Sequence, residues 1–207
     1  QRDKMGAAFG FHRFMDTLGA SIGILLSYLL MTKFKGNYQA VFVISLIPAV
    51  LGVCCLFFVR EKRSAAQGTI PTQGQRLKLE WSSLNPTLKS FLLVAFLFTL
   101  GNSSNQFLLM RAQNLGFSAT QVILLYFTYN VVYTLFAYPA GKLSDILGRR
   151  SLLVLGYLFY GVVYIGFALV NNPRSLWLLF ATYGLYIACT EGVEKALVAE
   201  IAPPHQR

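Results

Sequence analysis

Long apolar stretches alternate with short polar segments along most of this chain. Six of these stretches cover approximately residues 6–31, 38–59, 89–110, 119–140, 151–170 and 175–201. A helix must be about 20 residues long to cross the roughly 30 Å hydrocarbon layer of a membrane. The pattern therefore predicts six transmembrane helices and an all-α membrane protein.

Composition agrees with this prediction and excludes an ordinary soluble domain. Hydrophobic residues make up 55% of the chain and charged residues only 13%, whereas soluble domains carry about 25% charged residues. The net charge of +10 is compatible with nucleic-acid binding, but the loop topology of a membrane protein explains it more simply. Cys54, Cys55 and Cys189 lie inside apolar stretches, so we expect buried thiols, no disulfide and no metal site.

One long polar segment divides the six stretches into a pair and a group of four. Residues 60–88 are rich in Gln, Ser, Thr and charged residues, a composition typical of a flexible linker. We therefore expect two membrane units, residues 1–59 and 89–207, joined by this linker.

The positions of lysine and arginine predict the orientation of the helices. Lys33, Lys35, Arg111 and Arg174 lie at one set of helix ends. Twelve basic residues lie at the other ends, namely Arg2, Lys4, Arg60, Lys62, Arg63, Arg76, Lys78, Lys89, Lys142, Arg149, Arg150 and Arg207. Because basic residues accumulate on the cytoplasmic side, both ends of the chain and the linker are expected in the cytoplasm.

The segment GKLSDILGRR connects the fourth and fifth predicted helices. Gly141 ends one helix, Asp145 follows, Gly148 turns the backbone, and Arg149 and Arg150 open the next helix. Asp145 is placed to meet the N-terminus of a neighbouring helix or to pair with an arginine. This segment resembles the signature loop of the major facilitator superfamily, a large family of secondary transporters.

The resemblance implies a place in a larger plan. Family members typically have twelve spans in two halves, joined by a long cytoplasmic loop, with the signature loop after the second span of each half. The chain then resembles spans five to ten. Residues 1–59 hold the last two spans of the N-terminal half, 60–88 the cytoplasmic central linker, and 89–207 the first four spans of the C-terminal half. On this interpretation the chain is a fragment with an incomplete transport cavity.

In the family, the signature loop acts as a cytoplasmic gate between the halves. The resemblance gives that role to Gly141, Asp145, Gly148, Arg149 and Arg150. Two positions depart from family patterns. Ile146 stands where a basic residue is common, which removes one expected gate ion pair, and Ile24 replaces the proline of an antiporter signature, which weakens an assignment to drug–proton antiport.

Polar and small residues form a stripe along the first predicted helix. They are His12, Asp16, Gly19, Ala20, Gly23 and Ser27, spaced by three and four, opposite a face of leucines. We expect the stripe to meet protein or a cavity, Gly19 and Gly23 to pack closely against another helix, and the leucine face to meet lipid. Asp16 lies about 15 Å along the helix from Gly6, and its spacing from His12 and Arg13 suits ion pairing.

The last predicted helix carries a matching group of charges. Glu191, Glu194 and Lys195 share one face, and Glu191 lies about 15 Å from Ile201. Ionisable side chains at such depth are costly and mark a pathway or a partner. Two explanations stay open for this charge network of His12, Arg13, Asp16, Glu191, Glu194 and Lys195. It consists of structural ion pairs, such as Glu191 with Lys195, or one of its carboxylates couples transport to protons.

Consecutive polar residues interrupt the third predicted helix at GNSSNQ, residues 101–106. They cover every face of a helix, so the helix must bend or break unless one of them faces lipid. Because the corresponding family span lines the central cavity, we expect cavity positions for Asn102, Ser103, Asn105 and Gln106. The predicted cavity also includes Tyr126, Asn130, Tyr133 and Tyr183. An interface between the fourth and first spans is an equal alternative for the fourth-span residues, and Tyr157, Tyr160 and Tyr164 are assigned to packing.

These features predict a secondary active transporter that moves small solutes by alternating access, with or without proton coupling. The alternative is a non-transporting membrane receptor or scaffold with the same fold. We expect no enzyme, since HExxH and paired cysteine–histidine motifs are absent from the sequence. The expected partners are the lipid bilayer and a small-molecule substrate, with no nucleic acid, cofactor or metal. The full-length protein is expected to be a monomer, multi-pass in the bacterial cytoplasmic (inner) membrane.

Overall fold

The structure is a computed structural model that describes residues 5–58, 84–102 and 104–201. Its helices are α1 (Met5–Lys33), α2 (Tyr38–Leu56), α3 (Pro86–Gly101), α4 (Asn105–Asn114), α5 (Ala119–Leu147), α6 (Arg149–Leu169) and α7 (Pro173–Ile201). The described residues contain six candidate membrane spans by length and composition, with α3 and α4 sharing one. The all-α fold and the six predicted spans are therefore confirmed.

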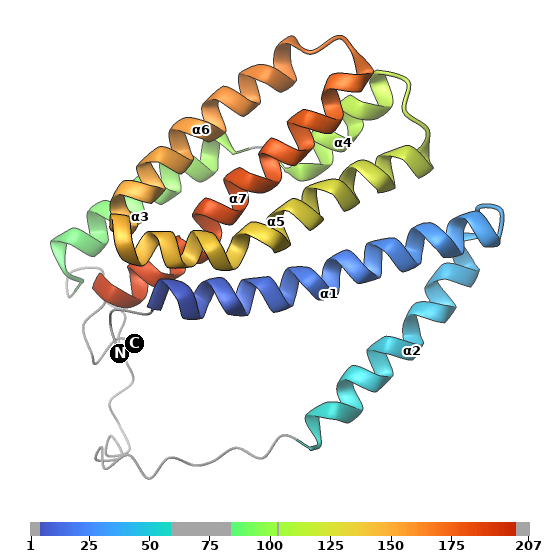
Figure 1. Ribbon diagram of the computed structural model, residues 1–207, viewed down its shortest axis with the longest axis horizontal. Coiled ribbons are helices and arrows are strands. Elements are labelled where there is room, and N and C mark those ends of the chain that lie inside the picture. Colours follow the sequence, from blue (N-terminus) through green and yellow to red (C-terminus); the bar gives the residue numbers. More distant parts are fainter. Residues whose placement is uncertain (1–4, 59–83, 103, 202–207) are drawn as a thin grey trace.

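Helices α1, α5 and α7 form the centre of the molecule, where α5 packs against both of the others and α6 packs on α7 (Figure 1). Helix α2 diverges from α1, and its apolar side chains are largely exposed, as lipid contact requires. Cys54 and Cys55 lie on this helix and are exposed. The expectation of buried thiols is wrong for these two, because α2 has few described neighbours.

The ends of the central helices gather on one side of the molecule. The beginning of α1, the end of α5, the beginning of α6 and the end of α7 lie together (Figure 1). Both ends of the chain, and residues 60–83 of the predicted 60–88 linker, lie outside the described residues. Their cytoplasmic location stays a prediction.

Helix α5 is longer than the predicted span of 119–140. It begins with a capping box formed by Ser118 and Gln121 and continues to Leu147, a length of about 43 Å at 1.5 Å per residue. Gly141 is therefore inside a helix, and its expected role in a turn is wrong. The turn is made by Gly148, whose φ of 88° suits glycine.

The predicted interruption of the third span is confirmed as a break between α3 and α4. Helix α3 ends at Gly101, and Ser104 caps α4 by accepting a hydrogen bond from the backbone N–H of Gln106 at 3.3 Å. The hydroxyl of Tyr160 donates a hydrogen bond to the carbonyl oxygen of Gly101 at 3.1 Å. A neighbouring helix thus satisfies a backbone group that the break frees, as a membrane interior demands.

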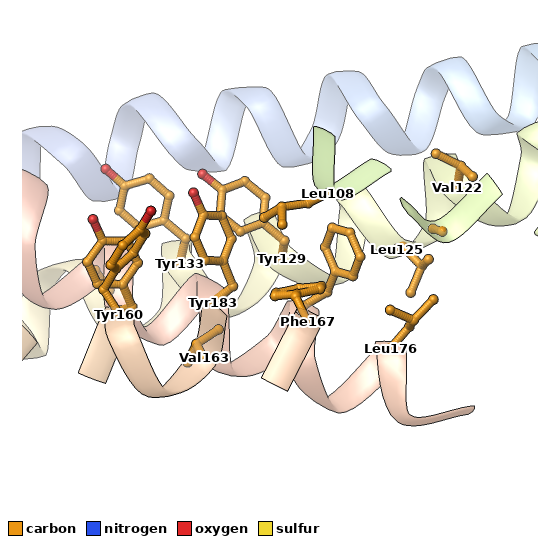
Figure 2. Packing of buried hydrophobic residues seen from close by; sticks show 14 of the residues in the cluster. Leu108, Val122, Leu125, Tyr129, Tyr133, Tyr160, Val163, Phe167, Leu176 and Tyr183 are labelled. Atoms are coloured by element: carbon orange, nitrogen blue, oxygen red, sulfur yellow. The ribbon is translucent and has the colours of Figure 1, made fainter. Parts of the chain in front are cut away.

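The core changes character along its length. Leu125 and Leu176 lie toward one end of the cluster, whereas Tyr133, Tyr160 and Tyr183 gather toward the other (Figure 2). Buried tyrosines need partners for their hydroxyl groups. The tyrosine end therefore marks where the interior becomes polar.

Candidate functional site

A pocket of ≈ 410 Å³ lies beside the break between α3 and α4. Helices α5 and α7 supply the opposite wall. Its lining residues are Phe98, Thr99, Asn102, Ser104, Asn105, Tyr129, Tyr183, Tyr186, Ile187, Thr190, Glu191 and Glu194. We call it the tyrosine pocket. Of the residues predicted for the cavity, it brings together Asn102, Asn105 and Tyr183.

Hydrogen bonds from tyrosines position the two asparagines of the break. The hydroxyl of Tyr183 donates to Asn105 Oδ1 at 2.7 Å, and that of Tyr164 donates to Asn102 Oδ1 at 3.5 Å. The ring of Tyr183 also stacks on that of Tyr129, with centroids 5.5 Å apart, and Figure 2 shows the two rings side by side. The break is therefore held against α6 and α7 by specific contacts.

A charge cluster links three helices next to this pocket. Arg13 of α1 forms ion pairs with Asp16 at 2.9 Å and with Glu191 of α7. The hydroxyl of Tyr133 on α5 donates a hydrogen bond to the second carboxylate oxygen of Glu191. The expected pairing of Arg13 with Asp16 is confirmed, whereas Glu191 pairs with Arg13 rather than with Lys195.

Glu194 differs from Glu191 in its partners. Its Oε1 accepts a hydrogen bond from the hydroxyl of Tyr157 at 2.9 Å. No lysine, arginine or histidine of the described residues lies within ion-pair distance of its carboxylate. Among the described residues, the pocket thus contains one carboxylate paired with arginine and one that accepts a hydrogen bond from a tyrosine without an ion pair.

Several residues predicted for these sites lie elsewhere. His12 and Lys195 are exposed and form no ion pair with described residues, and Gln106 is exposed outside the pocket lining. Asn130 is buried and donates to the carbonyl oxygen of Tyr126 in its own helix at 2.8 Å. These positions were assigned from helical periodicity, which does not report which neighbour covers a face.

Two further residues predicted for the cavity, Tyr126 and Ser103, are not in the lining of the tyrosine pocket. Tyr126 lines a second, apolar pocket between α1, α2, α4 and α5 instead of the tyrosine pocket. It lies there with Ala20, Gly23 and Ser27 from the predicted polar stripe of α1, so this part of the stripe does meet a cavity. Ser103 lies outside the described residues.

A second polar cluster joins the ends of α1, α5, α6 and α7. Asp145 accepts hydrogen bonds from the backbone N–H groups of Gly6 and Ala7, each at 2.9 Å, and pairs with Arg149 at 3.0 Å. Arg149 also forms an ion pair with Glu200. Both contacts considered for Asp145 from the sequence therefore occur. We call this group the Asp145 cluster.

The other residues of the 141–150 segment have different surroundings. Arg150 is exposed and lines a separate apolar pocket between α3, α6 and α7. Ile146, which stands where the family resemblance implies a basic residue, is 80% exposed. Gly141 packs on α1, where a Cβ atom would lie 2.3 Å from the Gly6 carbonyl oxygen.

Close packing of α1 involves glycines other than those predicted. Gly6 and Gly10 contact α5 directly, whereas a Cβ atom on Gly19 or Gly23 would meet nothing within 4 Å. Residues 19–23, GASIG, also match the G-x-S-x-G spelling of a hydrolase nucleophile, which belongs on a strand–turn–helix. Here the segment is continuous helix, and the Ser21 hydroxyl lies 3.2 Å from that of Thr134.

Metal binding has no structural basis in the described residues. Within 5–58, 84–102 and 104–201, no three His, Cys, Asp or Glu side chains are grouped to hold an ion. The chemistry available is ion pairing, hydrogen bonding and contact with aromatic rings.

Sequence reasoning missed part of the pocket wall. Tyr186 and Thr190 line the pocket, and they follow Tyr183 on α7 at intervals of three and four residues, which was a usable signal. Tyr157, Tyr160 and Tyr164 were assigned to packing, yet their hydroxyls reach Glu194, Gly101 and Asn102. Each of these hydrogen bonds crosses between helices, so local spacing does not reveal it.

Comparison with known proteins identifies the family. The family described as Major Facilitator Superfamily matches residues 1–207. The chain is 35% identical over 204 residues to "Uncharacterized MFS-type transporter MJ1317" of Methanocaldococcus jannaschii, covering 96% of this chain and 50% of that protein. It is 29% identical over 92 residues to "Uncharacterized MFS-type transporter MJ1560" of the same organism, covering 44% of this chain and 24% of that protein. No solved structure matches.

The chain thus spans about half the length of the first of these relatives. Both relatives are archaeal, and the expected bacterial origin stays a prediction. The family match, the six candidate spans and the two relatives agree on an integral, multi-pass membrane protein of a transporter family rather than an enzyme family. The chain belongs to the Major Facilitator Superfamily.

Proposed function

We propose that this chain is part of a secondary active transporter that moves a small solute by alternating access, with the tyrosine pocket as part of its solute site. The observation that carries this proposal is the broken span. It places Asn102 and Asn105 beside Glu191 and Glu194 in one pocket between apolar helices. Transporters commonly form solute sites from discontinuous helices near the middle of the membrane.

The place of the chain in the whole protein is part of the same proposal. Residues 1–59 form the last two spans of the N-terminal half, residues 60–88 the central linker, and residues 89–207 the first four spans of the C-terminal half. The coverage of half of the relative's length supports this division. So does the contact between the first and second units, where α1 packs along α5.

The Asp145 cluster acts as a gate on this proposal. It connects α1 of the first unit with α5, α6 and α7 of the second. An anion at the N-terminus of a helix is stabilised by the helix dipole and free N–H groups. Because the acceptor and the donors belong to different units, the units must break these bonds before they separate at this end.

Proton coupling, where it operates, uses Glu194 rather than Glu191. Arg13 and Tyr133 hold both oxygens of Glu191, which suits a structural role. Glu194 has one hydrogen-bond donor and no ion pair among the described residues, so a proton can neutralise it without breaking such a pair.

Uptake by the intact transporter in proteoliposomes tests this function. We expect accumulation of a solute from a broad panel, and loss of it when Asn105 and Glu194 are both replaced. Flux that is independent of a proton gradient would remove proton coupling from the proposal. No flux for any solute would instead favour a receptor or scaffold.

A further inference from the structure

The wall of the tyrosine pocket combines aromatic rings with carboxylate groups. Phe98, Tyr129, Tyr183 and Tyr186 contribute rings to its wall, and Glu191 and Glu194 contribute carboxylates. Among the lining residues there is no lysine, arginine or histidine. The wall therefore offers no partner of opposite charge to an anionic solute.

The charges around the pocket do not balance. Arg13 faces Glu191 and also pairs with Asp16 on its own helix. Glu194 adds a third carboxylate, and the neighbouring Lys195 is exposed and makes no ion pair with described residues. Arg13 pairs with two of these carboxylates, and Lys195 acts on Glu194 without an ion-pair contact. Two basic residues against three carboxylates leave a net negative charge among the described residues of this site. A negative charge between apolar helices favours a cation.

The rings favour an organic cation over an inorganic one. The faces of tyrosine and phenylalanine attract cations and contact apolar groups at the same time. The volume of ≈ 410 Å³ is within the range of small-molecule sites, about 300–1,000 Å³. A bare metal ion would leave most of this space and most of the aromatic wall without contact.

We propose that the tyrosine pocket binds a monovalent organic cation with aromatic or aliphatic groups, and that Glu194 is its counter-ion. This inference rests on the proposed function and names its substrate class. Asn102 and Asn105, held by Tyr164 and Tyr183, supply the polar contacts at the end of the pocket formed by the helix break.

Two probes of nearly the same size and shape separate charge from apolar contact. Tetraphenylphosphonium is a permanent cation and tetraphenylborate is its anionic counterpart. We expect the intact transporter in detergent to bind radiolabelled tetraphenylphosphonium in equilibrium dialysis, at least tenfold more tightly than tetraphenylborate. Equal affinity for the two probes would overturn the inference.

Variants of Glu194 test the counter-ion. Glu194→Gln keeps the size of the side chain and an acceptor for Tyr157 but removes the charge, and we expect at least tenfold weaker cation binding. Glu194→Asp keeps the charge and is expected to stay within about threefold of the wild type. Unchanged affinity in Glu194→Gln would overturn the inference.

Variants of Tyr186 test the role of the aromatic wall independently of Glu194. Tyr186→Phe keeps the ring and is expected to bind as the wild type does, whereas Tyr186→Leu should weaken binding severalfold. Equal binding by the two would contradict a role for the ring. Thermal unfolding of each variant without probe shows that it is folded.

The binding and flux experiments together show which of the two proposals is wrong. If the cation binds but no solute is transported, cation binding is supported and the proposed transport function is contradicted. If neutral or anionic solutes are transported and tetraphenylphosphonium does not inhibit that transport, the transport function is supported and the organic-cation inference is contradicted.

Discussion

Gly141 of α5 packs against Gly6 of α1 so closely that a Cβ atom on Gly141 would lie 2.3 Å from the carbonyl oxygen of Gly6. Gly10 of α1 continues this contact, since a Cβ atom there would lie 2.7 Å from the carbonyl oxygen of Ala137. The small residues allow the two backbones to approach directly. This approach also places the first N–H groups of α1 within reach of Asp145.

Replacement of Gly141 by alanine is therefore expected to destabilise the protein. The new methyl group must push α1 away from α5, and such overpacking costs about 1–3 kcal/mol. Thermal unfolding in detergent should show a lower midpoint. Gly161→Ala on α6 is the matched control, because a Cβ atom there meets nothing within 4 Å. Equal effects of the two substitutions would contradict the close-packing explanation.

Asp145→Asn should loosen the beginning of α1. The substitution removes the charge that the helix dipole and Arg149 stabilise, a loss of about 1–2 kcal/mol. Hydrogen exchange of the Gly6 and Ala7 amides should accelerate about fivefold or more. Ile146→Asn is the control, because its side chain is exposed on the same turn. No change in these amides would show that the Asp145 cluster does not hold α1.

Arg13 and Glu191 should show strong thermodynamic coupling. Removing one partner leaves the other charge unpaired in a partly buried position, whereas removing both leaves only the carboxylate of Asp16, which is 58% exposed, without its arginine. We expect Arg13→Met and Glu191→Met each to lower stability, and the double variant to be less destabilised than the sum by about 0.5–3 kcal/mol. Unfolding of the four proteins completes the cycle. Additive effects would show that the ion pair between Arg13 and Glu191 contributes no measurable stability.

Tyr183→Phe is expected to release the beginning of α4. The substitution removes only the hydroxyl that donates to Asn105 Oδ1 at 2.7 Å, and one such bond contributes about 1 kcal/mol, or about fivefold in exchange rate. Hydrogen exchange of residues 105–108 should increase accordingly. Tyr38→Phe is the control, because Tyr38 is 61% exposed on α2. Faster exchange at residues 105–108 in both variants would argue against a specific contact.

The sequence predicted the spans well because the signal is local. A stretch of about 20 apolar residues is needed wherever a helix crosses a membrane, and Asn102 and Asn105 stand in a polar run that no lipid-facing helix accepts. The pairing of Arg13 with Asp16 follows from a spacing of three residues within α1. These features need no knowledge of which helices are neighbours.

Predictions that required neighbours were less successful. One of the two explanations left open for the charge network paired Glu191 with Lys195, one turn away, but Glu191 meets Arg13, 178 positions away in sequence. Gly141 was expected to end a helix, yet it lies inside α5 and packs against Gly6 of α1. Tyr157 and Tyr164 were assigned to packing, but their hydroxyls donate hydrogen bonds to acceptors on α7 and at the helix break.

The sequence by itself determined the class of the protein, its spans, the break in the third span and the turn at Gly148, because hydrophobic length and backbone conformation are properties of adjacent residues. The tertiary structure alone decided which of the charged and tyrosine residues share a pocket. Side chains on different helices meet only when the helices pack. The packing of α1 against both α5 and α7 brings Arg13 to Glu191, while Glu194 lines the tyrosine pocket with no ion pair among the described residues.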